Sequence, residues 1–325
     1  MVQSVSSVTV ADLVKNVRLK VLQGEDYLDR PIITSDICRP ALEFAGYFTH
    51  YPAERIQLLG ITETSFANEL THDKRKNYLG RMCKPQTPCF VVSTDLLVMT
   101  ELEKAAKEAH IPVLGTHLTS SRILGNMTSY LVSRLAPRKS VHGVLVDING
   151  VGVLITGDSG IGKSETALEL VRRGHRLVAD DRVEVYARDE QTLVGSAPAI
   201  LQHLMEIRGI GIINVMTLYG TGAIMPEDTI DFIVHLETWT PDTQFDRLGD
   251  RGDTQIIQGV VVPKVSVPVR TGRNLAIIIE SAAMNYRANT MGYDATETFD
   301  ENLNRLIKQN TARDNAMRGN QDNGK

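Results

Sequence analysis

The sequence of 325 residues is short of cysteine, of aromatic residues and of long apolar runs. Its three cysteines, Cys38, Cys83 and Cys89, have no paired C-x-x-C spacing, so they indicate reduced thiols rather than a disulfide framework or a metal site. The longest apolar stretches, such as residues 275–279, are too short to span a bilayer, and residues 1–10 lack the charged start and apolar core of a secretory signal. These absences predict a cytoplasmic protein that makes no contact with a membrane.

An excess of charge of one sign is also lacking. The 35 Lys and Arg residues face 39 Asp and Glu residues, which gives a formal net charge of −4, and no basic block interleaved with aromatic residues occurs. Because such blocks neutralise the phosphates of a nucleic acid, their absence argues against a nucleic-acid partner. The length is enough for two domains, each with its own core.

What the sequence does contain is a phosphate loop near its middle, with two glycines five positions apart that are followed by a lysine and a hydroxyl residue. The loop comprises Gly157, Asp158, Ser159, Gly160, Ile161, Gly162, Lys163 and Ser164. Its glycines allow the backbone to form an anion-binding nest, Lys163 can reach the β- and γ-phosphate oxygens of a nucleotide, and Ser164 can bind Mg²⁺. All eight residues are therefore predicted to form a nucleotide site.

The segments on either side of the phosphate loop indicate a strand before it and a helix after it. Residues 151–156 are an apolar, β-branched run, and residues 164–173 carry apolar residues at helical spacing. Upstream, residues 141–148 alternate like a second strand, and Asn149-Gly150 between the two strands is a strong hairpin signal. The loop strand should therefore have an antiparallel neighbour, which favours a P-loop kinase with a mixed sheet over a parallel switch GTPase.

The first part of the chain alternates between short apolar strands and amphipathic helices, as in a small α/β domain with a largely parallel sheet. Strands are expected at residues 56–59, 89–92 and 111–114, and helices at residues 73–82, 102–109 and 120–135. Thr100 and Glu103 have the spacing of a capping box at the start of the second of these helices. This half contains no motif that we can connect to chemistry.

A proline and two charged residues break the pattern at residues 136–140, and we expect a domain boundary there. The predicted organisation is an N-terminal α/β domain at 1–135, a P-loop catalytic domain at 136–310 and a disordered polar tail at 311–325.

Two adjacent carboxylates, Asp180 and Asp181, close an apolar run that follows the predicted helix. Where a strand ends beside a phosphate loop, one carboxylate can hold the metal or its bound water while the other serves as a base. Partial burial of Asp181 is also expected. A solvated turn is the alternative interpretation, because Asp pairs are common at strand ends.

Three further segments carry charges that can face an anion. Glu206 and Arg208 stand two positions apart before a G-x-G turn, so both can point to one side of an extended segment, toward phosphate and Mg²⁺. A surface ion pair is the alternative. Residues 246–253 and 263–273 mix arginines with turn residues and are predicted to be mobile loops that close on an anion, with solvated loops as the alternative.

Residues 205–214, taken with the phosphate loop, closely resemble the HPr kinase/phosphorylase family. Residues 165–170, 179–182 and 245–249 also match the family pattern, and the resemblance covers nearly the whole chain. It implies a C-terminal P-loop domain related to phosphoenolpyruvate carboxykinase, which suits the predicted hairpin.

The resemblance also implies a function. Enzymes of this family phosphorylate a seryl hydroxyl of HPr, the phosphocarrier of the sugar phosphotransferase system, with ATP or pyrophosphate as donor. They reverse the modification by phosphorolysis, in which phosphate attacks the phosphoserine and pyrophosphate leaves. The balance controls carbon catabolite repression, with fructose 1,6-bisphosphate favouring the kinase and phosphate the reverse reaction, and the family forms homohexamers.

Roles for individual residues follow from the resemblance as well. It implies that Lys163 binds phosphates, that Ser164 and Glu206 bind Mg²⁺, and that Asp181 accepts the proton. It adds His142 and Arg247 as active-site residues, although the residue pattern alone gives no reason to choose His142. It implicates residues 205–214 in both reactions and assigns a further set mainly to dephosphorylation: Pro268, Val269, Arg270, Thr271, Gly272 and Arg273.

Two other classes of function compete with this one. A nucleotide-dependent switch or assembly ATPase would use the phosphate loop to order other loops, but it positions water and needs no base for an alcohol, so the Asp pair counts against it. A P-loop small-molecule kinase is the other alternative.

Overall fold

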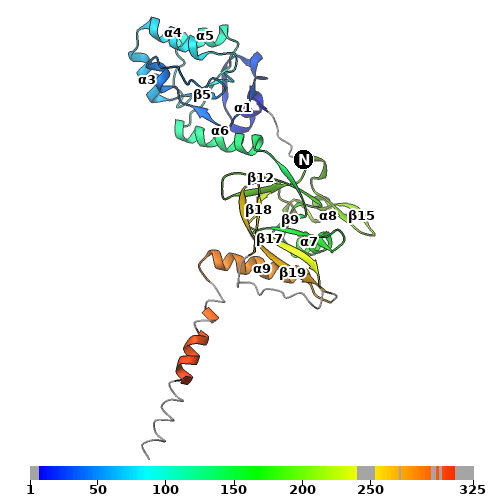
Figure 1. Ribbon diagram of the computed structural model, residues 1–325. Coiled ribbons are helices and arrows are strands. Elements are labelled where there is room, and N and C mark those ends of the chain that lie inside the picture. Colours follow the sequence, from blue (N-terminus) through cyan, green and yellow to red (C-terminus); the bar gives the residue numbers. More distant parts are fainter. Residues whose placement is uncertain (1–6, 240–252, 271, 294–297, 300–301, 312–325) are drawn as a thin grey trace, which may run out of the picture. The chain divides into compact units, whose positions relative to one another are not determined.

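The computed structural model describes residues 7–239, 253–270, 272–293, 298–299 and 302–311. The chain divides into two compact units, residues 1–139 and 140–325, which we describe separately (Figure 1). Within the described residues, no helix combines the length and the apolar character needed to cross a membrane.

The N-terminal unit is built on a five-stranded sheet with a small two-stranded ribbon beside it. The strand order of the sheet is β2-β7-β6-β5-β4, for Lys20–Gln23, Val113–Gly115, Phe90–Val92, Ile56–Leu59 and Ile37–Cys38. The strands β4, β5, β6 and β7 run parallel, and β2 is antiparallel to β7. The ribbon pairs β1 (Val8–Thr9) with β3 (Pro31–Ile32). The predicted, largely parallel sheet is therefore confirmed.

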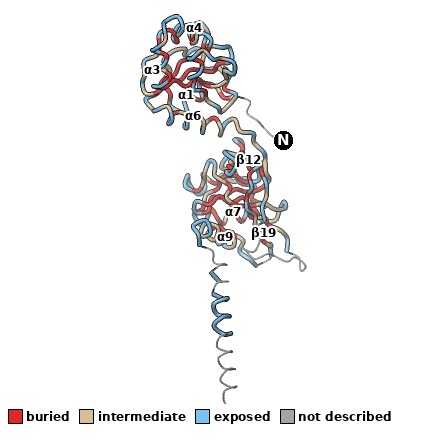
Figure 2. Tube along the Cα trace, turned by 60° about the vertical axis from the view of Figure 1, so that its left-hand side comes forward, coloured by how far each residue is buried: buried red, intermediate tan, exposed pale blue. Residues whose placement is uncertain are grey.

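Helices cover both faces of this sheet because successive strand residues point to opposite sides. The helices are α1 (Val10–Val17), α2 (Ala41–Phe44), α3 (Ile61–Glu69), α4 (His72–Met82), α5 (Thr100–Glu108) and α6 (Ser120–Leu135), with a short 3₁₀ turn η1 (Glu25–Tyr27). Leu58 and Val91 pack with α1 and α6, whereas Leu59 and Val92 pack with α2 to α5. Figure 2 shows the resulting buried centre.

The expected capping box at α5 is wrong. Thr100 is the first helical residue, and the N-cap is Met99, which makes no side-chain cap hydrogen bond. Met99 is 9% exposed and belongs to the apolar cluster on this face, so its packing sets where the helix begins. A carboxylate does cap α3, where Glu63 accepts a hydrogen bond of 2.9 Å from the backbone N–H of Gly60.

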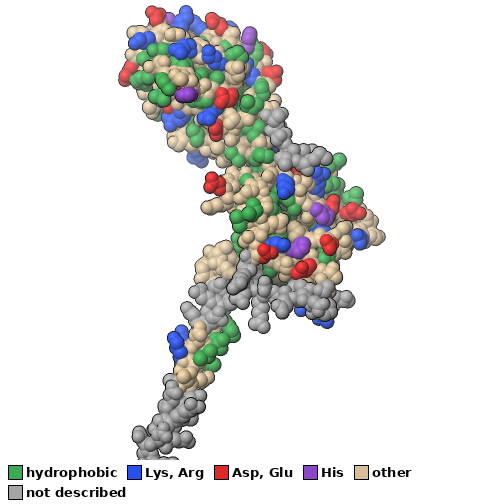
Figure 3. All heavy atoms as spheres, viewed as in Figure 1, with side chains coloured by type: hydrophobic (Ala, Val, Ile, Leu, Met, Phe, Trp, Pro, Cys, Tyr) green, Lys and Arg blue, Asp and Glu red, His purple; other side chains and the backbone are tan. Residues whose placement is uncertain are grey.

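The three cysteines are free thiols, as their spacing predicts. Burial raises the pKa of Cys38, Cys83 and Cys89 to about 12 in each case, so the thiols stay protonated. On the face shown in Figure 3, acidic and basic side chains of this unit are interspersed.

The C-terminal unit is organised around a mixed six-stranded sheet. Its order is β11-β9-β10-β17-β19-β18, for Arg176–Ala179, Val144–Asp147, Gly152–Gly157, Phe232–Thr238, Val260–Val269 and Asp253–Ile257. The central strands β10, β17 and β19 are parallel, whereas β9 is antiparallel to both of its neighbours and β18 is antiparallel to β19. The predicted mixed sheet is confirmed.

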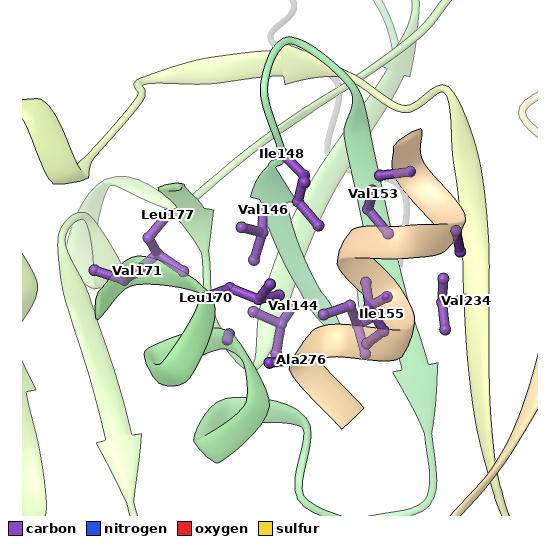
Figure 4. Packing of buried hydrophobic residues seen from close by; sticks show 14 of the residues in the cluster. Val144, Val146, Ile148, Val153, Ile155, Leu170, Val171, Leu177, Val234 and Ala276 are labelled. Carbon is purple, nitrogen blue, oxygen red and sulfur yellow. The ribbon is translucent and has the colours of Figure 1, made fainter. Parts of the chain in front are cut away.

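Two further layers enclose this sheet. A four-stranded sheet covers one face, in the order β16 (Glu227–Thr229), β13 (Leu193–Ser196), β12 (Arg182–Ala187) and β8 (Lys139–His142). The other face packs against α7 (Lys163–Arg172) and α9 (Leu275–Thr290). Figure 4 shows Leu170 of α7 and Ala276 of α9 lying against Val144 and Ile155 of the sheet.

A smaller group of elements flanks α7. It consists of η2 (Ala199–Leu201), the antiparallel pair β14 (Leu204–Ile207) and β15 (Gly211–Asn214), the short helix α8 (Val215–Tyr219) and the turn η3 (Thr221–Ala223). Residues 302–311 are also helical. The predicted tail at 311–325 lies outside the described residues except for its first position.

The predicted hairpin before the phosphate loop is confirmed, but its first strand begins at Val144: residues 141 and 142, expected in the same strand, belong to β8 of the four-stranded sheet. Asn149 and Gly150 connect β9 to β10 with φ values of 54° and 86°, the left-handed pair that a tight two-residue turn requires. Ile148 and Val151 exchange backbone hydrogen bonds of 2.8 and 3.2 Å on either side of the turn. This hairpin positions β10, which leads directly into the phosphate loop.

Candidate functional site

A polar cavity of about 140 Å³ lies where β10 ends and α7 begins. It is lined by His142, Ser159, Gly160, Gly162, Lys163, Ser164, Glu165, Asp180, Asp181, Glu206 and Arg208. Residues from four distant stretches of sequence meet here, and all of them except Glu165 were expected to belong to the site. Glu165 follows Ser164 in the first turn of α7, where an acidic residue is common for helix-dipole reasons and gives no separate signal of function.

The glycines of the phosphate loop are needed for its path. Gly157, Gly160 and Gly162 have φ values of 140°, 82° and 101°, which residues with a Cβ rarely adopt. A Cβ on Gly157 would overlap the carbonyl oxygen of Leu236, and one on Gly160 would lie 2.6 Å from the guanidinium of Arg208. The loop therefore presses its backbone against β17 on one side and against Arg208 on the other.

Lys163 folds back over the loop from the first position of α7. Its ammonium donates hydrogen bonds to the carbonyl oxygens of Gly157 and Asp158, at 2.8 and 2.9 Å. Burial lowers the pKa of Lys163, while the negative charges of Asp181 and Asp158 oppose that shift. The ammonium is thus a partly desolvated cation held close to the loop, where it can exchange its carbonyl contacts for phosphate oxygens.

Asp180 is the buried member of the acidic pair. It is 4% exposed, its Oδ1 accepts a hydrogen bond of 2.8 Å from the Ser164 hydroxyl, and its Oδ2 accepts one of 3.0 Å from the backbone N–H of Glu206. Burial raises the pKa of Asp180, and these hydrogen bonds work in the opposite direction. Asp180 therefore joins the start of α7 to β14.

Asp181 differs from Asp180 in its backbone conformation and in its exposure to solvent. Its backbone is left-handed, with φ 61°, and its side chain is 66% exposed. The partial burial expected for Asp181 is wrong, because the left-handed turn directs the two carboxylates into different surroundings and leaves the buried place to Asp180. Nδ1 of His142 lies 3.3 Å from Oδ1 of Asp181 and 2.9 Å from its carbonyl oxygen.

The strand pair β14–β15 presents Glu206 and Arg208 to the cavity. Met205 and Ile207 are 1% and 6% exposed and belong to the core around α7, so the alternate residues turn the other way. Both charged side chains are described, and no ion pair joins them. The period-two spacing places them together on the cavity side.

The mobile loop expected at residues 263–273 is wrong for residues 263–269, which belong to strand β19 and pair with β17 and β18. Residues 246–252 of the other expected loop lie outside the described residues. Pro268 and Val269, expected to act in dephosphorylation, are the last residues of β19, and the guanidinium of Arg270 lies 4.4 Å from the ring centroid of Trp239. A turn follows, in which the backbone N–H of Arg273 bonds to the carbonyl of Arg270 at 3.2 Å.

These residues are not among those that line the cavity. Gly272 has a φ of 88° in this turn. Arg247 and Thr271 lie outside the described residues.

The donor set of the cavity fits Mg²⁺ better than a transition metal. The hydroxyl of Ser164 and the carboxylates of Asp180 and Glu206 supply hard oxygen ligands. Among the residues that the structure describes, no group of three or more His, Cys, Asp or Glu side chains is arranged to hold a metal by itself. Mg²⁺ is usually held by one or two carboxylates together with substrate phosphates, and the oxygen donors of this cavity fit that type of site.

Comparison with known proteins places the chain in a family. Residues 8–131 match the model of the HPr Serine kinase N terminus, and residues 133–303 match that of the HPr Serine kinase C-terminal domain. The HPr kinase/phosphorylase of Limosilactobacillus reuteri is 81% identical over 309 residues, covering 95% of this chain and 97% of that protein. The HPr kinase/phosphorylase of Levilactobacillus brevis is 67% identical over 304 residues, covering 94% and 98%.

A solved structure, that of the Hpr(Ser) kinase/phosphatase from Coxiella burnetii, is 36% identical, covers 50% of this chain and 98% of that one, and has a TM-score of 0.45. Because family models match both units and curated relatives match nearly the full length, the chain belongs to the HPr kinase/phosphorylase family of enzymes.

Proposed function

We propose that this enzyme phosphorylates a seryl hydroxyl of HPr with ATP or pyrophosphate and reverses the reaction by phosphorolysis. In the reverse direction phosphate attacks the phosphoserine and pyrophosphate leaves. The observation that carries the proposal is the exposed carboxylate of Asp181 on the wall of the same cavity as the phosphate loop. An alcohol acceptor needs a base at that place, whereas a nucleotide switch does not.

The phosphate loop and Lys163 hold the polyphosphate donor. Backbone N–H groups of the loop and the start of α7 offer hydrogen bonds to anionic oxygens, and Lys163 supplies a mobile positive charge. Ser164 and Glu206 are the residues that hold Mg²⁺, which neutralises charge on the transferring phosphoryl group when it is bound. Asp180 accepts the Ser164 O–H, so the lone pairs of that hydroxyl are free to face a cation.

Asp181 takes the proton of the attacking serine in the forward direction and returns it to the leaving serine oxygen in the reverse direction. Exposure makes its carboxylate accessible to a protein substrate, which could not approach the buried Asp180. His142 contacts both the side chain and the backbone carbonyl of Asp181, and it thereby orients the carboxylate. Arg247 is assigned to the same centre on family resemblance.

Phosphorolysis also requires a place for free phosphate. The turn after β19 carries Arg270 and Arg273, and two guanidinium groups suit a phosphate dianion. The proposal includes a homohexamer, fructose 1,6-bisphosphate as the effector that favours the kinase, a cytoplasmic location and control of carbon catabolite repression. These parts rest on membership of the family.

The decisive experiment incubates the protein with ATP, Mg²⁺ and HPr. One phosphoserine should appear on HPr, and it should disappear with release of pyrophosphate when phosphate is added. ATP hydrolysis without phosphoserine would favour the switch or assembly ATPase, and transfer to a small metabolite but not to HPr would favour the small-molecule kinase. The Lys163→Ala variant is the control for contaminating kinases.

A further inference from the structure

The far end of α7 from the phosphate loop closes with a histidine in an unusual place. The backbone N–H groups of Gly174 and His175 bond to the carbonyls of Val171 and Leu170, at 3.0 and 3.2 Å, and Gly174 has a φ of 98°. This is a Schellman helix end, in which the residue after the glycine commonly makes an apolar contact with the helix. Here that residue is His175, only 4% exposed.

Within the described part of the chain, neither ring nitrogen of His175 has a hydrogen-bond partner. The nearest charged group is Glu280 on α9, whose Oε1 lies 3.3 Å from Nε2 in poor hydrogen-bonding geometry. Nδ1 has no corresponding partner on its side of the ring. Buried polar atoms are nearly always paired, so an orphaned nitrogen on the wall of a cavity suits a ligand that carries a hydrogen-bonding group.

His175 lies on the wall of a second cavity, with a volume of about 370 Å³. The lining residues are Val171, Arg172, Gly174, His175, Tyr219, Gly222 and Ala223. The volume is within the range of pockets that take small molecules. The cavity is bounded by the end of α7, the end of α8 and the turn η3.

The charges around this cavity favour an anion. Its described lining residues include the basic residue Arg172 and no acidic residue. The Arg172 side chain is 65% exposed, and its contact with Glu169 is a long one of 3.8 Å, so the ion pair is weak. Glu169 and Glu280 make shorter contacts with Arg173, at 3.1 and 3.3 Å.

We propose that this cavity is a second binding site, which takes a small molecule bearing a phosphate or carboxylate group through Arg172, His175 and the hydroxyl of Tyr219. An oxyanion at Nδ1 would give the ring a hydrogen-bond partner that no described residue supplies. The ligand would touch the helix that carries Lys163 and Ser164 and the helix that follows the Glu206–Arg208 strand pair.

Equilibrium dialysis of the full chain with radiolabelled inorganic phosphate tests the site by counting bound phosphates per chain. The parent protein should bind one phosphate more than His175→Asn or Arg172→Gln. The same difference should appear in a Lys163→Ala background, where the phosphate loop is impaired. Arg122→Gln, an exposed arginine of α6, is the matched control and should leave the count unchanged.

Labelled glycerol phosphate and labelled acetate distinguish the sources of the oxyanion. Binding of glycerol phosphate at least tenfold tighter than inorganic phosphate would indicate an organic phosphate, and binding of acetate alone would indicate a carboxylate. Circular dichroism checks folding, and if His175→Asn does not fold, Arg172→Gln and Tyr219→Phe decide. The site would be refuted if both variants bound all three probes with the same stoichiometry and affinity as the parent protein. That outcome does not depend on which acceptor is phosphorylated at the phosphate-loop cavity.

Discussion

Acidic residues lie near both ends of strand β10, but their hydrogen bonding differs between the two ends. Near its carboxyl end, Asp180 and Asp181 lie beside Lys163; Asp180 accepts a hydrogen bond from Ser164, and the Asp181 carboxylate lies 3.3 Å from Nδ1 of His142. At its amino end, three aspartates gather around Gly152 with one arginine, Arg176, among them. They are Asp147, Asp228 and Asp231.

The amino-end cluster is only partly satisfied. Asp231 accepts a 2.7 Å hydrogen bond from the Gly152 N–H, and Asp147 pairs with Arg176 at 3.1 Å. Oδ2 of Asp228 is buried without a hydrogen-bond partner among the described groups. Burial, followed by the charges of Asp147 and Asp231, raises the pKa of Asp228 to about 6.

The two groups differ in how they are paired: those near Lys163 line the cavity, whereas Asp228 at the other end is buried with an unpaired oxygen. We therefore expect substitutions at the carboxyl end to reduce activity and leave stability nearly unchanged, and a substitution at the amino end to do the reverse.

The largest effect is expected from Lys163→Ala. Removal of the cation that neutralises the β- and γ-phosphates should reduce transfer from ATP by a factor of about a thousand or more. Folding should change little, because the ammonium bonds only to carbonyls of a surface loop. Assays of HPr phosphorylation and thermal unfolding measure both, with Lys139→Ala, an exposed lysine of β8, as control. Near-normal kinase activity would refute the role of the phosphate loop.

The next effect distinguishes the two adjacent aspartates. Asp181→Asn keeps the shape but cannot accept the proton, so it should bind ATP–Mg²⁺ and yet lose kinase and phosphorylase activities together, each by a factor of about a hundred. Asp180→Asn should instead weaken binding of ATP–Mg²⁺, since it disturbs the Ser164 hydroxyl.

Nucleotide titration and both activity assays on the two variants decide this. If Asp181→Asn no longer bound ATP–Mg²⁺, Asp181 would be a metal-site residue. If either reaction survived in that variant, another group would handle the proton.

A smaller and directional effect is expected from Arg270→Ala. Phosphorolysis must hold a free phosphate in line with the phosphoserine, so the reverse activity should fall about tenfold and the forward activity less than about threefold. The two rates are measured on the same preparation, with the exposed Arg188→Ala as control. Equal losses in both directions would remove the special role of this turn.

The smallest effect is expected at the amino end of β10, and it depends on pH. The folded-state pKa of Asp228, about 6, exceeds its ordinary value of 3.8, so the folded protein binds this proton more tightly than the unfolded chain. Stability from this group is therefore greatest at low pH and is lost as the pH rises through about 6.

Asp228→Asn should accordingly raise the free energy of unfolding at pH 8 by about 1 to 2 kcal/mol, a figure reduced for solvent screening, with a smaller gain at pH 5. Kinase activity should stay near that of the parent. Urea unfolding at both pH values measures the difference, and Glu190→Gln, an exposed acid in the turn between β12 and β13, is the control. A gain of equal size at both pH values would show that charge is not the cause.

Local patterns explain which parts of the fold could be predicted from the sequence. Asn149-Gly150 determines a turn by itself, and the alternation of Met205, Glu206 and Ile207 determines which side chains face the cavity. The start of α5 was mispredicted because the packing of Met99 outweighs a capping motif. The packing of Met99 involves residues that are distant in sequence, so local spacing could not predict it.

Other features depend on residues that are distant in sequence. The four-stranded sheet that covers β10 has no single local signal, and its edge strand β8 brings His142 to Asp181, so only family resemblance indicated that histidine. The burial of Asp180 rather than Asp181 depends on one left-handed residue and on β14. The cluster around Gly152 likewise joins residues from β9, β16 and the position just before β17.

The bridge made by Asp180 is also a thermodynamic link. One carboxylate satisfies a hydroxyl at the start of α7 and an amide of β14, so it adds a polar link between two segments that also share the core around α7. Any ligand that draws the Ser164 oxygen toward itself alters the acceptor on which the Glu206 amide depends, and any protein that shifts β14 alters the Ser164 oxygen in return. Such coupling is reciprocal by necessity. A ligand bound at Ser164 and a protein bound at β14 would therefore each change the affinity for the other.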